Sequence, residues 1–474
     1  MSKIVQNSTI YIFLNFFQKG INLLLLPVLT VYLTTNDYGI VAVVVGINSF
    51  LNIFYLLCLN ASLNRFYYEY KGDKLKTKKL FGTIITFVLI FSAFLSLILF
   101  VAHKWLIDPF LDSIDFFPYM FLGMISVLFN PVFAIFQSAM QAKQEGKRFG
   151  KNNFAFFIVN VVFVLITVLG FNLGAKGVLG SLAITNVLFG FYTLGKFGKE
   201  IVFGIDWQIL KTCLRYSLPL VPHSLSAVAT NFIDRIFVNT FLSTSLVGIY
   251  SLGNVFGSIV LFIATGINQA FVPWFNEKVK KQEQNQIPEK AKLIVLGYCI
   301  IALGLSFFGK DVISILTPKA YHDAWQVVPF FAFSAVFNGI YYFLVAPLFY
   351  NLKANGNRII PLLTISTAII NITLNYFFTI KYGIMGTAVS TLISKMILAV
   401  LVSLVYKKFM KINFYVKLMM IYAFSFFILS LLIFVNFEWN QFLIKLAIYL
   451  LLIVIVFIMN KKKFIELSTT FRKY

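Results

Sequence analysis

Charged side chains are scarce in this sequence: only 12% of its 474 residues are Asp, Glu, Lys or Arg, against roughly 25% in soluble globular proteins. Long polar segments are also missing, which leaves no room for a soluble domain between the apolar stretches. Hydrophobic residues make up 59% of the chain, and apolar stretches of about 20 residues, enough to cross a bilayer, recur from end to end. Because unpaired backbone cannot face lipid, the sequence predicts an all-α integral membrane protein.

Cysteine and histidine are rare, with three of each. Cys58, Cys213 and Cys299 are widely spaced, so we expect neither a disulfide framework nor a metal site. No G-x-x-x-x-G-K-[ST] loop occurs, which argues against direct ATP hydrolysis. The connections on the expected outer side are short and hold no catalytic constellation. We therefore expect a protein that is not an enzyme and has no cofactor.

The apolar stretches predict about 14 transmembrane helices, with centres near residues 21, 51, 91, 128, 163, 186, 228, 259, 300, 338, 370, 395, 425 and 451. The first stretch is too long for a signal-peptide core and lacks a cleavage site, so we expect it to remain as a span. Lys and Arg gather in every second connection, for example "QAKQEGKRFGKNN". The positive-inside rule places both termini in the cytoplasm. Basic loops that bind a polyanion are the alternative, but even alternation favours a topology signal.

Three weak internal matches indicate a repeat of about 210 residues: Gly146 and Arg148 with Gly356 and Arg358, Gly177 and Gly180 with Gly383 and Gly386, and Gly39 with Gly248. We therefore expect an N-terminal lobe at 1–205, a C-terminal lobe at 206–406, and two extra helices with a basic tail at 407–474. Each lobe holds six spans, an even number, so both have the same orientation, as in transporters whose halves rock about a central site.

Polar residues at helical spacing follow the first two spans of each expected copy. They are Asn15, Gln18 or Lys19, and Asn22; Asn48, Asn52 and Tyr55; His223, Thr230, Asn231 and Asp234; and Asn254, Ser258, Thr265 and Asn268. Such amides either tie helices together in a dry bundle or line a wetted cavity. Four stripes on helices related by the repeat favour the cavity.

The charges left inside the expected spans are mostly basic. They are Lys19, Arg235, Lys395 and Lys445, with Asp234 as the one acid. A charge at mid-bilayer costs roughly 2.5–3.5 kcal/mol on insertion scales and usually marks function. We expect Lys19 to face a cavity, Lys395 to face a cavity or a lobe contact, and Lys445 to snorkel to the outer interface. Arg235 suits a phosphate group, with Asp234 orienting it or a neighbouring hydroxyl; interfacial anchoring of both is the alternative.

A family resemblance begins at residue 217, in "SLPLVPHSLSAVATNFIDRIFVNTFLSTSLVGIYSLGNVFGSI". Pro219, Pro222, the Asp234–Arg235 pair and 247–251 resemble the second-lobe opening of Wzx-type polysaccharide flippases, members of the multidrug/oligosaccharidyl-lipid/polysaccharide superfamily. The resemblance implies a V-shaped arrangement of two six-helix lobes, like that of multidrug (MATE) transporters, in the bacterial inner membrane. It also implies that an undecaprenyl-pyrophosphate-linked repeat unit of O-antigen, capsule or exopolysaccharide moves to the outer leaflet by alternating access.

The same resemblance implies membrane lipids, a polysaccharide polymerase and glycosyltransferases as partners, and no nucleic acid. The candidate cavity residues are Lys19, Arg235, Asp234, Asn15, Gln18, Asn22, Asn48, Asn52, Asn231, Asn254 and Lys395. Two rivals share the fold. A multidrug cation antiporter needs buried carboxylates, of which the spans offer only Asp234. A lipid II flippase is expected to carry arginine-rich cytoplasmic motifs, which this sequence lacks.

Overall fold

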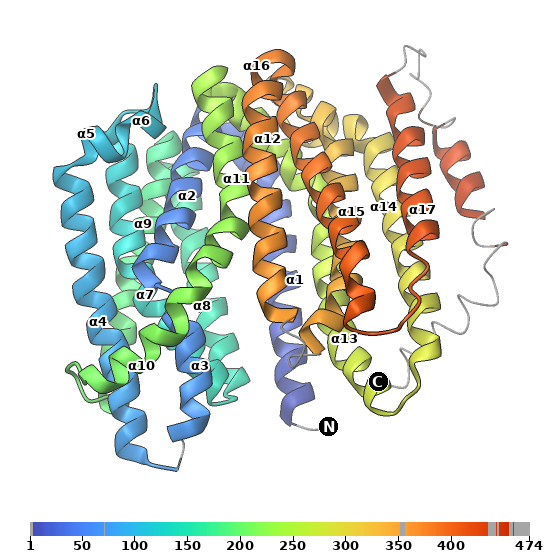
Figure 1. Ribbon diagram of the computed structural model, residues 1–474. Helices are drawn as coiled ribbons and strands as arrows, with labels where there is room; N and C mark the ends of the chain where they lie inside the picture. Colours follow the sequence, from blue (N-terminus) through green and yellow to red (C-terminus); the bar gives the residue numbers. More distant parts are fainter. Residues whose placement is uncertain are drawn as a thin grey trace. The chain divides into compact units, whose positions relative to one another are not determined.

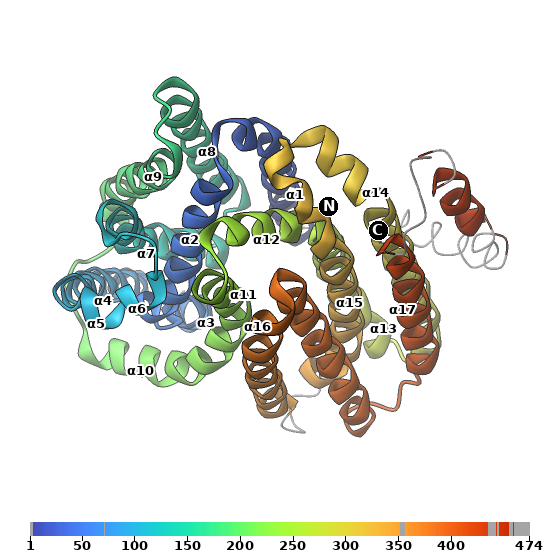
Figure 2. The ribbon, with the colours of Figure 1, turned by 90° about the horizontal axis from the view of Figure 1, so that it is seen from above.

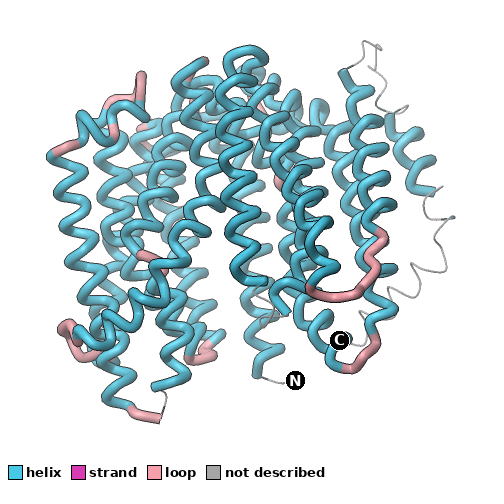
Figure 3. Tube along the Cα trace, in the orientation of Figure 1, coloured by secondary structure: helices cyan, strands magenta, loops and turns pink. Residues whose placement is uncertain are grey.

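The computed structural model describes residues 3–70, 72–350, 356–434 and 445–454, together with Phe442 and Ile458. Throughout these residues the regular elements are helices (Figure 3). The chain divides into two compact units, Met1–Ser251 and Leu252–Tyr474. This division falls inside one helix, while the lobe boundaries expected from the repeat stay a prediction.

The first unit is a bundle of long helices, coloured blue to green in Figure 1, with several shorter ones at its ends. Its helices are α1 (Lys3–Tyr32), α2 (Thr35–Leu56), α3 (Leu59–Tyr70), α4 (Lys74–Val101), α5 (His103–Leu106), α6 (Asp108–Leu111), α7 (Phe121–Ala142), α8 (Gly146–Leu165), α9 (Gly174–Phe197), α10 (Trp207–Ser217), α11 (Val221–Phe241) and the first half of α12 (Thr244–Gly257).

Helix α7 is central to the first unit because it packs against α2, α3, α4, α8 and α9. A large apolar core fills the space between them and includes the fully buried side chains Phe81, Phe136 and Phe197. At one end of this core, Glu200, just after α9, forms ion pairs with Lys143 and with Arg148, whose N–O distance to Glu200 is 2.8 Å. These contacts join the connection between α7 and α8 to the end of α9.

The second unit is a helical bundle around α15, coloured yellow to red in Figure 1 and seen end-on in Figure 2. Besides the end of α12 it holds α13 (Ile259–Lys280), α14 (Ile287–Leu316), α15 (Val328–Tyr350), α16 (Gly356–Val405) and α17 (Val416–Ser430). Helix α15 packs against α13, α14, α16 and α17. Its residues from Val328 to Ile340 are buried without exception.

Nine described helices or helix pairs are long and apolar enough to cross a membrane. They are Thr35–Tyr70, Lys74–Val101, Phe116–Ala142, Gly146–Gly170, Gly174–Phe197, Ile259–Lys280, Gln284–Leu316, Lys319–Tyr350 and Ile359–Lys408. Each of the expected span centres falls within a described helix. The all-α, multi-pass membrane class is therefore confirmed, while the number 14 stays a prediction.

Two glycines with a left-handed backbone bear on the register of the internal repeat. Gly174, at the start of α9, has φ +54°, and Gly383, inside α16, has φ +63°. Glycine adopts this conformation far more readily than other residues, and the two positions are 209 residues apart, as are Gly39 and Gly248. The sequence match paired Gly177 with Gly383 instead, three residues out of this register. Gly383 also interrupts α16 between the two spans expected there.

Candidate functional site

The candidate site lies where α11 crosses α2 in the first unit. Nη1 of Arg235 on α11 is 3.5 Å from the position that a Cβ would occupy at Gly46 on α2. One turn away, the ring of Phe232 stacks on that of Phe50, with centroids 4.7 Å apart and an angle of 14°. Because Gly46 has no side chain, the guanidinium lies directly along the backbone of α2.

Asp234, the residue before Arg235, points elsewhere. It is 1% exposed, and Oδ2 accepts a hydrogen bond of 2.7 Å from the Tyr250 hydroxyl on α12. Adjacent residues on a helix are about 100° apart, and the two side chains accordingly follow different directions. The acid therefore fixes α11 to α12 and is sequestered from water.

Arg235 is partly exposed, and it forms no ion pair with any residue in the described part of the chain. Its guanidinium group is planar and permanently charged, and it can donate two parallel hydrogen bonds to the paired oxygens of a phosphate. The carboxylate of Asp234 lies within electrostatic range of Arg235 but makes no ion pair with it, so the guanidinium keeps the capacity to bind an anionic ligand. The site is thus better suited to an anion than to an organic cation.

Helices α2 and α12 cross closely at two glycines. A Cβ built on Gly39 would lie 1.9 Å from the carbonyl oxygen of Thr244, and a Cβ on Gly248 would lie 2.0 Å from that of Thr35. Thr244 is held in turn by Asn239, whose Oδ1 accepts from the threonine hydroxyl at 2.7 Å. Both glycines are therefore required for the close approach of the two backbones.

The expected polar stripe on α2 faces the interior of the first unit. Nδ2 of Asn48 donates to the carbonyl of Gly123 on α7 at 3.1 Å, and Tyr55 shares a hydrogen bond of 2.7 Å with Ser96 on α4. Asn52, four residues after Asn48, has a buried Oδ1 with no hydrogen-bond partner in the described structure. Asn48 is about 200° around the helix from Gly46, so this stripe does not adjoin Arg235.

The remaining candidates of the first unit are on α1 and α11. Gln18 donates to the carbonyl of Asn153 on α8 at 3.3 Å, which ties α1 to α8. Asn22 is exposed. The side chains of Asn15, Lys19 and Asn231 lie outside the described residues, so their cavity role stays a prediction.

The second unit holds the remaining candidates. Oδ1 of Asn254 accepts a hydrogen bond of 2.7 Å from Ser258, one turn along the chain, and Lys395 is partly buried on α16. The sequence suggested that Lys445 snorkels to the outer interface, and this prediction is wrong. Lys445 is 7% exposed and its Nζ lies 3.0 Å from Oδ2 of Asp311 on α14, because a buried ammonium needs a carboxylate partner.

A comparison with protein families bears on this arrangement. The family described as "Polysaccharide biosynthesis protein" matches residues 4–279, more than half of the chain. The chain belongs to this family. A curated relative of this polysaccharide biosynthesis protein is Lsg locus putative protein 1 of Haemophilus influenzae, which is 24% identical over 407 residues and is covered for 95% of its length, with 81% of this chain aligned.

Solved structures with the same fold include a flippase and multidrug transporters. A lipid II flippase, MurJ, in an inward closed conformation has a TM-score of 0.70 at 15% identity, covering 93% of this chain and all of that one. A MATE transporter of Vibrio cholerae has a TM-score of 0.57 at 16% identity, covering 88% and 98%. A transporter of Pyrococcus furiosus from the MOP superfamily has a TM-score of 0.53 at 15% identity, covering 86% and 95%.

Sequence reasoning singled out Arg235 and Asp234 but missed what surrounds them. Tyr250 lies in the "VGIYS" stretch that carried the family resemblance, yet nothing marked it as the partner of Asp234. Gly46 was missed because a glycine in an apolar run ordinarily indicates close helix packing. Gly46 and Phe50 are four residues apart and therefore lie on one face of α2, which was the available signal for this contact surface.

Proposed function

We propose that this polysaccharide biosynthesis protein is a flippase that moves an undecaprenyl-pyrophosphate-linked oligosaccharide repeat unit from the cytoplasmic to the outer leaflet. Transport would proceed by alternating access in the bacterial inner membrane, with both termini in the cytoplasm. The O-antigen, capsule or exopolysaccharide pathway would supply the substrate through its glycosyltransferases and pass the product to a polymerase. Membership of the family and the fold shared with a flippase and with transporters support this class.

The observation that carries the proposal is the environment of Arg235. Arg235 is partly exposed and its guanidinium lies against Gly46, while Asp234 beside it is buried and bonded to Tyr250. A diphosphate gains charge-assisted hydrogen bonds at such a group. Lys19, Asn15 and Asn22 on α1, Asn231 on α11 and Lys395 on α16 are proposed as further contacts to the diphosphate or to sugar hydroxyls.

A multidrug cation antiporter is less well supported. It needs a carboxylate that an organic cation or a coupling ion can reach, whereas the carboxylate of Asp234 is 1% exposed and is already bonded. The likeness to MATE transporters concerns the fold alone. A lipid II flippase is the other rival, and the likeness to MurJ concerns the fold in the same way.

The proposal is tested by deleting the gene and following the lipid-linked intermediates. We expect repeat units to accumulate on the cytoplasmic leaflet and surface polysaccharide to be lost, with growth and drug sensitivity unchanged. Arrested growth with accumulated lipid II would favour the lipid II flippase. Increased drug sensitivity with normal surface polysaccharide would favour the antiporter.

A further inference from the structure

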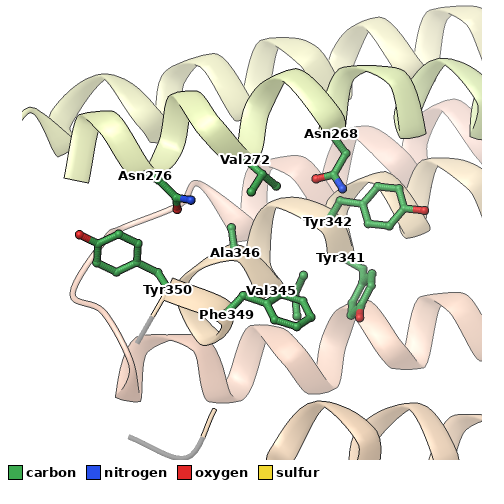
Figure 4. A pocket seen from close by; sticks show the side chains of 9 residues that line it. All are labelled: Asn268, Val272, Asn276, Tyr341, Tyr342, Val345, Ala346, Phe349 and Tyr350. Atoms are coloured by element: carbon green, nitrogen blue, oxygen red, sulfur yellow. The ribbon is translucent and has the colours of Figure 1, made fainter. Parts of the chain in front are cut away.

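A pocket with a volume of about 230 Å³ lies between α13 and α15 in the second unit. Helix α13 contributes Asn268 and Asn276, and α15 contributes Tyr341, Tyr342 and Tyr350. Figure 4 shows Asn268 and Tyr342 at one end and Asn276 and Tyr350 at the other. The pocket is smaller than the roughly 300–1,000 Å³ sites that take drug-sized ligands. It therefore fits a compact group.

The chemistry of the described lining favours a neutral ligand. The described residues that line the pocket include no Lys, Arg, Asp or Glu. A pyrophosphate would consequently be desolvated there without a counter-charge, which is strongly unfavourable. Amides and phenols instead donate and accept hydrogen bonds in both directions, as hydroxyl groups do. The flat faces of the tyrosine rings offer apolar surface between these polar groups.

Asn268 adds a second observation at the pocket. Its Oδ1 is buried and has no hydrogen-bond partner in the described structure. A buried acceptor left without a donor costs about 1–3 kcal/mol, so such groups are rarely retained without a use. A small rotation of the Asn268 amide would bring this oxygen into the pocket, where a hydroxyl group could donate to it.

Each of the two helices has a proline beside the pocket. Pro273 lies inside α13 and Pro347 lies inside α15, and each is next to a residue that lines the pocket, Val272 and Ala346. A proline removes one helical hydrogen bond and bends the helix away from the carbonyl four residues earlier. Each proline therefore removes one helical hydrogen bond beside the pocket.

The pocket opens toward the ends of its two helices. Phe349 and Tyr350 are 54% and 40% exposed, and Val272 on α13 is 38% exposed, whereas Val345 and Ala346 on α15 are 5% exposed each. Helix α13 ends at Lys280, next to one of the lysine-rich connections that the positive-inside rule assigns to the cytoplasm. The mouth therefore lies on the side from which a cytoplasmic substrate arrives.

We propose that the α13–α15 pocket binds one neutral sugar ring of the lipid-linked glycan on its cytoplasmic approach. Asn268 accepts from a ring hydroxyl, Tyr341 and Tyr342 pack against the ring, and Asn276 contacts the sugar at the mouth. This inference rests on the proposed function, but it concerns a site separate from the Arg235 site. In this scheme the α13–α15 pocket binds the sugar, and Arg235 binds the diphosphate.

The test compares two probes on the purified full-length chain in lipid nanodiscs: undecaprenyl pyrophosphate, and undecaprenyl pyrophosphate carrying one N-acetylhexosamine. We expect the wild-type chain to bind the sugar-bearing lipid more tightly than the bare lipid. In Asn268→Leu, affinity for the sugar-bearing lipid should fall about fivefold, the factor given by one lost hydrogen bond. Affinity for the bare lipid should not change.

Asn276→Ala provides a second variant at the exposed mouth, where folding is not at risk, and should reduce the sugar preference less. Equal weakening of both probes in Asn268→Leu would place the lipid tail in the pocket and overturn the inference. An unchanged preference for the sugar-bearing lipid in both variants would also overturn it. Failure of the wild-type chain to bind either probe would instead contradict the proposed function, and the sugar site with it.

Discussion

Gly39 of α2 and Gly248 of α12 meet at a crossing where each would strike the other helix's backbone if it carried a methyl group. The oxygen that a Cβ on Gly39 would strike belongs to Thr244, and the oxygen for Gly248 belongs to Thr35. Both the glycines and the threonines are 209 residues apart. Such a reciprocal contact is expected of two helices related by an internal repeat, and it supports the repeat inferred from weak sequence matches.

We predict that Gly39→Ala destabilises the protein. The added Cβ would lie 1.9 Å from the carbonyl oxygen of Thr244, so α2 and α12 must separate at a cost of about 1–3 kcal/mol. Thermal unfolding in detergent measures the effect as a lower Tm. The control is Gly180→Ala on α9, where nothing lies within 4 Å of the new Cβ. A Gly39→Ala variant as stable as this control would contradict the tight crossing.

We predict that side-chain size at Gly46 governs the Arg235 site. A Cβ at Gly46 would lie 3.5 Å from Nη1 of Arg235 and 3.6 Å from Cδ, which is ordinary contact, so Gly46→Ala should transport normally. Gly46→Leu should displace the guanidinium and lower transport by roughly tenfold, as expected when a charged hydrogen bond is lost. Surface polysaccharide at matched expression measures both variants. Equal transport by both would show that the position of Arg235 is irrelevant.

We predict a pH-dependent contribution from Glu200 to stability. Burial opposes ionisation of this carboxyl, but hydrogen bonds and charges from Lys143 and Arg148 outweigh burial and lower its pKa below the usual 4.5. Its stabilisation is therefore present above the ordinary pKa of an unfolded glutamate and is lost as the pH falls through the lowered value.

The measurement is the Tm of the wild-type protein and of Glu200→Gln across pH. The wild type should be more stable from neutral pH down to about 5, and the difference should shrink at more acidic pH. The exposed pair Lys281 and Glu277 provides a control, because Glu277→Gln should change Tm little at any pH. A stability difference that grows on acidification would contradict the interpretation.

We predict that Lys445→Met destabilises the second unit by about 3 kcal/mol, because it leaves the partly buried carboxylate of Asp311 without its cation. The double variant Lys445→Met with Asp311→Leu should recover much of the loss, since an apolar pair replaces an ion pair of similar volume. The Tm values of the two variants show whether Lys445 and Asp311 act as a pair. If the double variant is less stable than the single one, the residues do not act as a pair.

The sequence predicted the helical spans well because their length and apolar character follow from the bilayer itself. It also predicted that Asp234 and Arg235 would not face one another, which follows from helix geometry. It could not predict the face of Asn48, because the choice between a neighbouring carbonyl and a cavity depends on which helix packs there. The Lys445–Asp311 pair joins residues 134 positions apart, and no local pattern indicates such a contact.

The residues of the α13–α15 pocket also differ in how far the sequence could predict them. Asn268 belonged to a polar stripe visible in the sequence, although it was not among the candidate cavity residues. Tyr341 and Tyr342 lie in an apolar run without a polar period, so only the packing of α15 against α13 brings them to the asparagine. Helix periodicity indicates a face; the tertiary structure decides what that face meets.

The most direct test of the central claim is leaflet exposure in proteoliposomes. The purified chain is reconstituted with undecaprenyl-pyrophosphate-linked oligosaccharide, and a membrane-impermeant glycosidase reports the rate at which glycan from the inner leaflet reaches the outside. Our account predicts exposure by the wild-type chain, at least a tenfold slower rate for Arg235→Ala, and a partial rate for Arg235→Lys. Exposure by Arg235→Ala at the wild-type rate would contradict the claim that a fixed cation in the membrane recognises the diphosphate.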